Sequence, residues 1–486
     1  MSSLLPNITN NHHQKELNFV GKVKRKFFGR EDLEILRKAQ QTSPNKEKKV
    51  GSGEFGEVYQ AIWHRDEEES IQLLRFFGRE DLEILRKAQQ TSPNKEKSNR
   101  YSLNSDNSSN QQQILIPIEK ISLCKEVGSG EFGEVYQAIW HRDEEESIQV
   151  AVKQIQPEKL ISHHSSFLQE AAIMTKMRHE NVIQMFGVVL DIKAIMIVSE
   201  LASCGSLLEC LKSKAWHPSL SVDVLCDFAL QISNGMKYLS SQRLIHRDLA
   251  ARNILVHSPS KVKISDFGLS RSLGYGEEYY RSEFNLSMKL PIAWCAPECI
   301  NFLRFTSASD VWAYGVFLWE VFTYGQTPWE GISGSQILYA VDTQRLKLEK
   351  PKFCPSGIYN LMLKCWEWAA EKRPTFENIC NELPTLMPPL LVTVTDCRHK
   401  SLKENINYLI YEKGETIILL DKSTSLPGFW LGVSKTGNIG IFLPEHTIAF
   451  LGAQNPEITS YSIHYTKLYD YFYAKYLFLH PISMLN

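Results

Sequence analysis

The pattern of apolar and polar residues changes three times along this 486-residue chain. Between Ile114 and about residue 195, apolar residues form short strand-like runs (ISLCKEV, VAVKQI and AIMIVS) around one helical segment, SSFLQEAAIMTKM. Helical patterns dominate from about 205 to 385, and short strand-like runs return from about 391 to 451. We therefore predict an α+β chain with a small β-rich lobe, a larger helical lobe and a small all-β barrel.

The N-terminal region, residues 1–113, contains two exact internal repeats. The segment Phe27–Lys48 recurs as Phe76–Lys97, and Val50–Gln72 recurs as Val127–Gln149. A solenoid would show one period, whereas these two pairs have different spacings. A recent exon duplication or a misassembled gene model explains them better. We expect irregular or disordered structure here, in the polar linker that follows (98–113), and in the aromatic-rich tail (453–486).

Composition excludes several classes of function. Lys plus Arg (54) nearly balance Asp plus Glu (55), so no strong positive field attracts nucleic acid. The ten cysteines are scattered without a zinc-binding pattern, which favours a reducing compartment. The N-terminus is too polar for a secretory signal, and no run of about 18 apolar residues exists. We expect a cytoplasmic protein without a transmembrane segment; peripheral membrane association stays open.

A glycine-rich segment within the first β-rich region fits the pattern GxGxxG. Glycines allow backbone N–H groups to approach phosphate closely, although a purely structural turn would look the same. A dinucleotide-binding fold would need a helix next, but EVYQAIW is typical of a strand. The predicted nucleotide contacts are Val127, Gly128, Ser129, Gly130, Gly133 and Val135.

A lysine follows this segment on an apolar strand, Val150–Lys153. One ammonium group there can lie over the α- and β-phosphates of a nucleotide, with Ala151 lining the base site. Glu170, in the helical FLQEAAIM, is the candidate acidic partner that holds Lys153 in place. The alternatives are a solvated edge lysine and a surface glutamate. The first copy of the glycine-rich repeat lacks this lysine strand, so we predict that the second copy is the working one.

Two loops carry the residues expected for phosphoryl transfer. His246–Asn253 supplies Asp248 as the catalytic base and Asn253 as a ligand of Mg²⁺. A predicted hairpin, ILV and VKI, returns the chain to Asp266, the second metal ligand. Two metal ligands joined by a hairpin are far more specific than either loop alone. The implied cofactors are ATP and Mg²⁺.

At this point the chain resembles the eukaryotic protein kinases over residues 118–386. The resemblance implies the bilobal kinase fold, with Glu298 paired to Arg373 and Asp310 bracing the catalytic loop. By the same resemblance, Ser199 lies behind the adenine site. The hinge residues Glu200 and Ala202, together with Leu255, are expected to contact the nucleotide.

Two features favour tyrosine as the acceptor. Serine/threonine kinases usually have lysine two residues after the catalytic aspartate, whereas this chain has Ala250 there and the cation at Arg252. The segment Pro291–Trp294 is similar to the substrate platform of tyrosine kinases. KLPIAWCAPE, WEVFTYGQTPWEG, GSQIL and IYNLMLKCW resemble the ACK family of non-receptor tyrosine kinases, in which autophosphorylation is expected at Tyr280 or, as second choice, Tyr279. A pseudokinase would lack Lys153, Asp248 or Asp266.

The segment 388–452 is similar to an SH3 domain, which follows the kinase directly in the ACK family. EKGE, IILL, WLG and GIFLP carry this resemblance, and Trp430 and Pro444 can form one wall of a ligand groove. Two aromatic positions of that groove are missing: Val394–Arg398 contains no tyrosine, and Thr447 replaces another. We therefore expect weak or no binding of PxxP peptides. Instead, the domain would contact the kinase lobe or bind a nonstandard partner.

Other features of the ACK family are not matched. Its small-GTPase-binding segment has no counterpart in the tail, so this chain does not support GTPase binding. Only GREDLEILRKA resembles the last helix of the family's N-terminal SAM domain. The remaining predicted partners are protein substrates with tyrosine.

Overall fold

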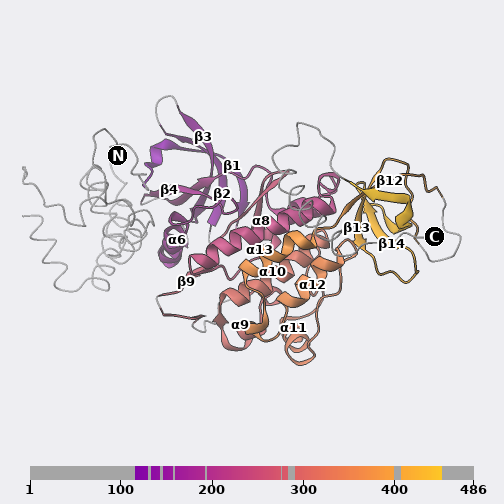
Figure 1. Cartoon of the computed structure of the whole chain (residues 1–486). Coiled ribbons are helices and arrows are strands. Elements are labelled where there is room, and N and C mark those ends of the chain that lie inside the picture. The colour runs from indigo at the N-terminus through magenta and orange to yellow at the C-terminus, as the bar shows by residue number, and fades with distance from the viewer. Residues whose placement is uncertain are drawn as a thin grey trace, which may run out of the picture. The chain divides into compact units, whose positions relative to one another are not determined.

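The structure is a computed structural model that describes most of the chain from residue 115 to 450. The described ranges are 115–129, 133–142, 146–156, 159–191, 194–274, 276–282, 290–398 and 407–450. The predictions for the N-terminal repeats, the linker, Gly130 and the aromatic tail lie outside these residues. Figure 1 shows the described part with its elements labelled.

The first lobe is built on a five-stranded antiparallel sheet with strand order β1-β2-β3-β5-β4. Alternation in β3 buries Val150 and Val152 on one face, where they pack with Val198 and Ile116. On the other side, Leu168 of helix α6 joins a larger core. The elements are β1 (Ile121–Ser129), β2 (Gly133–His141), β3 (Ser147–Ile155), α6 (Leu160–Thr175), β4 (Met185–Leu190) and β5 (Ile195–Glu200).

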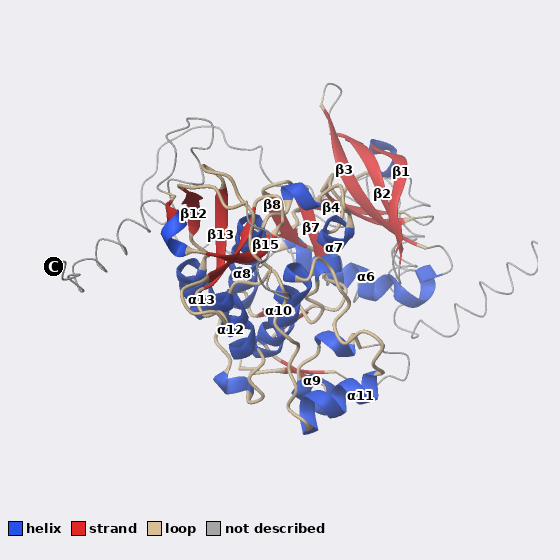
Figure 2. Ribbon diagram, turned by 90° about the vertical axis from the view of Figure 1, so that its right-hand side faces the viewer, coloured by secondary structure: helices blue, strands red, loops and turns tan. Residues whose placement is uncertain are grey.

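The second lobe is helical, as predicted, and surrounds the helix α10 (Ser307–Phe322). Apolar residues lie all around α10, and 13 of its 16 residues are buried, as expected for a central helix. A capping box starts it: Thr306 and Ser309 each accept a hydrogen bond from the other's backbone N–H. The other helices are α7 (Leu207–Lys212), α8 (Val222–Ser241), α9 (Pro297–Phe302), α11 (Gly334–Leu338), α12 (Ser356–Cys365) and α13 (Phe376–Glu382). Figure 2 distinguishes these helices from the strands by colour.

Three two-stranded sheets fix the loops of the second lobe. The predicted hairpin is present as β7 (Ile254–Ser258) paired with β8 (Lys261–Ile264). The other pairs join segments far apart in sequence, so each loop is held at both of its ends. They are β6 (Leu244–Ile245) with β9 (Arg271–Ser272), and β10 (Tyr280–Arg281) with β11 (Arg304–Phe305).

The last described segment forms a second five-stranded antiparallel sheet, with order β15-β14-β13-β12-β16. Its small core contains Leu391, Leu409, Tyr411 and Phe442, and the Tyr411 hydroxyl is 2.8 Å from His446 Nδ1. The strands are β12 (Leu390–Thr393), β13 (Thr416–Asp421), β14 (Trp430–Ser434), β15 (Ile439–Phe442) and β16 (Thr447–Ala449).

Membrane-spanning helices are not found among the described residues, where every helix is too short or too polar to cross a bilayer.

Candidate active site

The strand lysine and the helix glutamate lie together in the structure. Lys153 Nζ donates to both carboxylate oxygens of Glu170, at 2.7 and 2.9 Å, and lies 3.5 Å from Asp266 Oδ1. Glu170 is only 5% exposed. Burial alone would lower the pKa of Lys153, but the two carboxylates raise it above its usual value. The lysine is therefore a fixed cation held between the two lobes.

The described parts of the glycine-rich segment are Val127–Ser129, at the end of β1, and Gly133, at the start of β2. Gly133 is buried, and a Cβ there would lie 2.2 Å from the carbonyl oxygen of Gln154, so only glycine allows β2 to approach β3 at this point. Gly128 has open space around it, and Val127 is exposed. Val135 is paired in register with Lys153.

The catalytic loop is held by a buried carboxylate of α10. Asp310 accepts hydrogen bonds from the backbone N–H groups of His246, at 2.7 Å, and Arg247, at 2.9 Å. Arg247 has a φ of +70°, which is unusual for a residue with a side chain. The His246 ring bridges to the next loop, with Nε2 3.1 Å from the Ser265 carbonyl oxygen. The loop conformation is thus fixed from two sides.

Asp248 lies at the centre of this loop. Its Oδ1 pairs with Arg252, and its Oδ2 accepts a 2.7 Å hydrogen bond from the side-chain amide of Asn253. Burial raises the pKa of the Asp248 carboxyl, while Arg252 and the His246 ring oppose that rise. The sequence-predicted base and both of its predicted neighbours are therefore together.

The two predicted metal ligands come from adjacent loops. Asn253 uses its amide nitrogen on Asp248, which leaves its side-chain oxygen for a cation. The main-chain oxygen of Asn253 accepts hydrogen bonds from the Ser265 N–H (2.9 Å) and hydroxyl (2.8 Å). Because Asp266 is the next residue after Ser265, these bonds hold its loop beside that of Asn253. Burial opposes ionisation of Asp266, but Lys153, the Gly268 N–H and His246 together lower the pKa of its carboxyl.

Such a pair fits Mg²⁺, which takes one or two carboxylate or amide oxygens and completes its shell with phosphate and water. The described residues contain no cluster of three or more His, Cys, Asp or Glu side chains that would form an all-protein metal cage. The donor set is therefore suited to a metal that arrives with a nucleotide.

The segment between the lobes carries the remaining predicted nucleotide contacts. Ser199 on β5 is paired in register with Ala151. The Glu200 carboxylate accepts hydrogen bonds from Lys263 Nζ, at 2.7 and 2.8 Å, so its side chain is engaged within the protein. Ala202 follows β5 directly. Leu255 lies on β7 and is half-buried.

The two candidate phosphorylation sites lie against arginines. Tyr280, on β10, has its ring 4.9 Å from the Arg247 guanidinium, which is also 4.1 Å from the Phe305 ring. Tyr279 is 41% exposed and stacks on Arg304, at 4.3 Å. The buried Nε of Arg247 has no hydrogen-bond partner in the described part of the chain. A cation with unused donor capacity therefore faces Tyr280.

Comparison with known proteins decides the family. Residues 121–383, more than half of the chain, match the family described as protein tyrosine and serine/threonine kinase. This chain is a member of that family. An Ack-related non-receptor tyrosine kinase of Caenorhabditis elegans is 54% identical over 354 residues, which are 72% of this chain and 34% of the relative.

Two further relatives support the tyrosine-kinase branch. A protein named Activated Cdc42 kinase-like, from Drosophila melanogaster, is 52% identical over 69% of this chain and 25% of the relative. Human tyrosine-protein kinase FRK is 40% identical over 53% of this chain and 50% of the relative. The resemblance to the ACK family is confirmed for the kinase region, and this chain spans about a third or less of the two ACK-like relatives.

Sequence reasoning missed one residue of this kinase site, Glu320. It is 1% exposed on α10 and accepts hydrogen bonds from the Trp294 indole and the Ala251 N–H. A signal was available, because Asp310 and Glu320 are the only charged residues in this otherwise apolar helix. A charge in a buried helix requires partners, and both acids find them at the catalytic loop.

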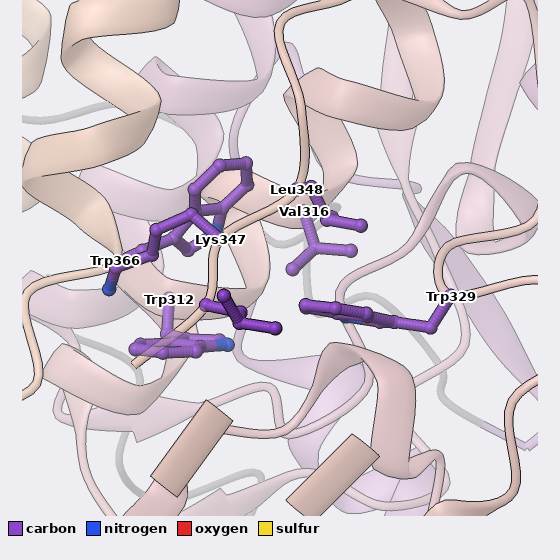
Figure 3. A pocket seen from close by; sticks show the side chains of 7 residues that line it. Trp312, Val316, Trp329, Lys347, Leu348 and Trp366 are labelled. Atoms are coloured by element: carbon purple, nitrogen blue, oxygen red, sulfur yellow. The ribbon is translucent and has the colours of Figure 1, made fainter. Parts of the chain in front are cut away.

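A small cavity in the helical lobe involves none of the predicted site residues. Its volume is about 10 Å³, room for roughly one water molecule. Figure 3 shows the Lys347 side chain extending over Trp312, and its ammonium nitrogen is 4.9 Å from that ring. Burial lowers the pKa of Lys347 to about 8. The cavity is lined by Trp312, Val316, Trp329, Leu346, Lys347, Leu348 and Trp366.

The small side chain of Ser199 generates a prediction about inhibitors. We expect Ser199→Met to weaken compounds that reach behind adenine by about tenfold or more, because the longer side chain fills the space they enter. The KM for ATP should stay nearly unchanged. Ser147→Met, at the exposed start of β3, is the matched control. Equal inhibitor affinity for Ser199→Met and the parent chain, measured by titration, contradicts the prediction.

Proposed function

We propose that the chain is an ATP-dependent non-receptor protein tyrosine kinase that transfers the γ-phosphoryl group to tyrosine hydroxyls of proteins, in ACK-like signalling with autophosphorylation. The observation that carries this proposal is the arrangement around Asp248, whose carboxylate lies between Arg252 and Asn253. The complete Lys153–Glu170–Asp266 cluster supports it, because a pseudokinase would lack part of that cluster. The proposed kinase domain is 118–386.

Each residue of the site has its own role in the proposed reaction. Lys153 would hold the α- and β-phosphates, and Glu170 keeps its ammonium in place. Asn253 and Asp266 would hold Mg²⁺, which neutralises charge that develops on the phosphates. Asp248 would orient the substrate hydroxyl and accept its proton. Most of the catalysis in this proposal is positioning and electrostatic stabilisation.

The surroundings of Asp248 support tyrosine as the acceptor. Arg252 stacks on the Trp294 ring, with its guanidinium carbon 4.4 Å from the ring centroid, while its other contact is Asp248. Ala250, where serine/threonine kinases usually carry lysine, is fully buried and supplies no cation beside Asp248. A flat aromatic wall suits the ring of a tyrosine substrate.

Replacement of Lys153 tests the function. We expect Lys153→Met to reduce phosphorylation of poly(Glu,Tyr) to background, because the phosphates lose their fixed cation. The chain should still fold, but its thermal unfolding midpoint should fall, because the buried Glu170 loses its cation. Lys364→Met, which removes a lysine from an exposed ion pair with Glu382, is the matched control and should remain active.

Deletion of Val50–Gln72 tests which glycine-rich copy works. The deletion should leave activity nearly unchanged, because only the second copy leads into Lys153. Loss of ATP binding on this deletion, with binding retained after substitution of Gly130 and Gly133, would overturn the assignment.

We also propose that phosphorylation of the activation segment regulates this kinase. Tyr280 is the first candidate and Tyr279 the second. A phosphate adds about −2 charge and pairs readily with arginine. Arg247 lies against the Tyr280 ring and has an unpartnered Nε, which supports Tyr280.

Mass spectrometry after incubation with ATP and Mg²⁺ should find phosphate on Tyr280. Tyr280→Phe keeps the ring on Arg247 and should abolish the rise in activity during that incubation. Tyr359→Phe, on α12, is a control at a tyrosine outside the segment. A fully active enzyme whose Tyr279 and Tyr280 both remain unmodified would refute the switch.

The C-terminal sheet, residues 388–452, is proposed to be an SH3 domain that packs on the kinase lobe. Asp421 accepts hydrogen bonds from Lys350, at 3.1 Å, and from Ser356, both in the kinase region. Ile418 and Leu420 belong to the same apolar cluster as the helical core. Trp430 packs edge-to-face on Phe442, with 6.3 Å between ring centroids. These contacts support an intramolecular role over generic PxxP binding.

Removal of Asp421 tests the packing. Asp421→Ala should lower the free energy of unfolding by about 1–3 kcal/mol, because hydrogen bonds to a charged acceptor are lost. Asp396→Ala, which loses an exposed pair with Arg398 and a hydrogen bond from the Lys413 N–H but no contact with the kinase region, should lower it less. Equal effects of the two substitutions in chemical denaturation, or a micromolar PxxP ligand whose binding Trp430→Ala abolishes, would show the proposal to be wrong.

Protein substrates with tyrosine are the proposed partners, and the proposed location is cytoplasmic. The name of the Drosophila relative refers to Cdc42. We assign no GTPase-binding segment to the described residues of this chain.

A further inference from the structure

Glu320 connects two parts of the site that are distant in sequence. One oxygen, Oε2, accepts a 3.0 Å hydrogen bond from the Ala251 N–H in the catalytic loop and a 2.9 Å bond from Trp294 Nε1. The residue is 1% exposed and lies on α10, whose first turn carries Asp310. Ten residues of helix separate the two acids, which corresponds to about 15 Å along the axis.

The contacts continue from Trp294 to the reacting centre. The Trp294 ring lies under the Arg252 guanidinium, at 4.4 Å, and Arg252 pairs with Asp248 Oδ1. Trp294 itself ends the short 3-10 helix Ile292–Trp294, in the predicted substrate platform. A shift of the indole would therefore move both the platform and the cation that fixes Asp248.

From this geometry we infer that Glu320 is a positioning residue: by holding Trp294 and the Ala251 N–H on one oxygen, it sets the tyrosine-substrate platform in register with Asp248. The inference rests on the proposed tyrosine kinase function and adds a residue to it. Glu320 does not touch the reacting atoms. Its effect passes through Trp294 and Arg252.

The two hydrogen bonds that Glu320 accepts allow its positioning effect to be tested separately from its charge. Burial raises the pKa of Glu320 to about 7, against the opposing effect of its two hydrogen bonds. Since both donors use one oxygen, a glutamine amide oxygen can accept both bonds without a carboxylate charge. Leucine has a similar volume but accepts neither bond, so it leaves two buried donors unsatisfied.

The experiment compares Glu320→Leu, Glu320→Gln and Trp294→Phe in the full chain. For Glu320→Leu we expect kcat/KM for a tyrosine peptide to fall about tenfold or more, with the KM for ATP within about twofold. Glu320→Gln should recover activity to within about threefold of the parent chain. Trp294→Phe should lose part of the activity and add little in the Glu320→Leu background, because the two changes remove one contact. Glu382→Gln, in an exposed ion pair, is the matched control.

Hydrogen exchange provides a readout that does not depend on turnover. In Glu320→Leu, exchange should increase in segments 248–253 and 291–296, while Glu320→Gln should resemble the parent chain. Equal effects of leucine on peptide and ATP kinetics, a glutamine variant as impaired as leucine, or unchanged exchange would overturn the inference. A parent chain that binds ATP but phosphorylates no tyrosine peptide would instead contradict the proposed function, and the exchange measurement would still test the role of Glu320. If Glu320→Leu fails to fold, Trp294→Phe and Glu320→Gln still distinguish the outcomes.

Discussion

The buried carboxylate of Asp310 is the interaction on which the active site depends. It accepts hydrogen bonds from the backbone N–H groups of His246 and Arg247 and lies in a mostly apolar helix whose other charged residue is Glu320. A carboxylate without such partners is very unfavourable in the interior. Because α10 is packed on all sides, the catalytic loop has to lie against the helix to supply these hydrogen-bond donors. The loop then adopts a backbone conformation at Arg247, with φ of +70°, that the sequence alone would disfavour.

Other buried charges are likewise compensated by a partner of opposite charge. Arg373, whose side chain is fully buried, donates to both oxygens of Glu298 at 2.6 and 2.9 Å. Removing one member of such a pair leaves an uncompensated charge, so each pair constrains two segments at once. Here the constrained segments are the end of the activation segment and the loop before α13. Lys153 and Glu170 do the same for the sheet and α6. Charge compensation, in addition to apolar packing, therefore fixes the relative position of the loops.

Much of this arrangement could be predicted from the sequence, because the patterns that indicate it lie within short segments of the chain. The hairpin β7–β8 and the strand of Lys153 follow from apolar alternation and short turns. The motif residues Asp248, Asn253 and Asp266 lie on loops whose spacing is set by that hairpin. Contacts between distant segments, such as Glu298 with Arg373, were expected only where the resemblance to protein kinases supplied them. Glu320 escaped prediction because its partners, Trp294 and Ala251, are 26 and 69 residues away and the resemblance did not name them. No periodic pattern marks a contact of that kind; only the presence of an acid in an apolar helix does.

The contact of Arg247 with Tyr280 places a buried cation against aromatic rings instead of an anion. The guanidinium lies between the rings of Tyr280 and Phe305, whose faces partly replace the water it has lost. Burial and the nearby Arg271 nevertheless lower the pKa of Arg247, so its charge is incompletely compensated. Aromatic faces are weaker partners for arginine than a planar anion, which can take two N–H donors at once. The contact therefore holds Tyr280 against Arg247, while Nε of Arg247 has no hydrogen-bond partner among the described residues.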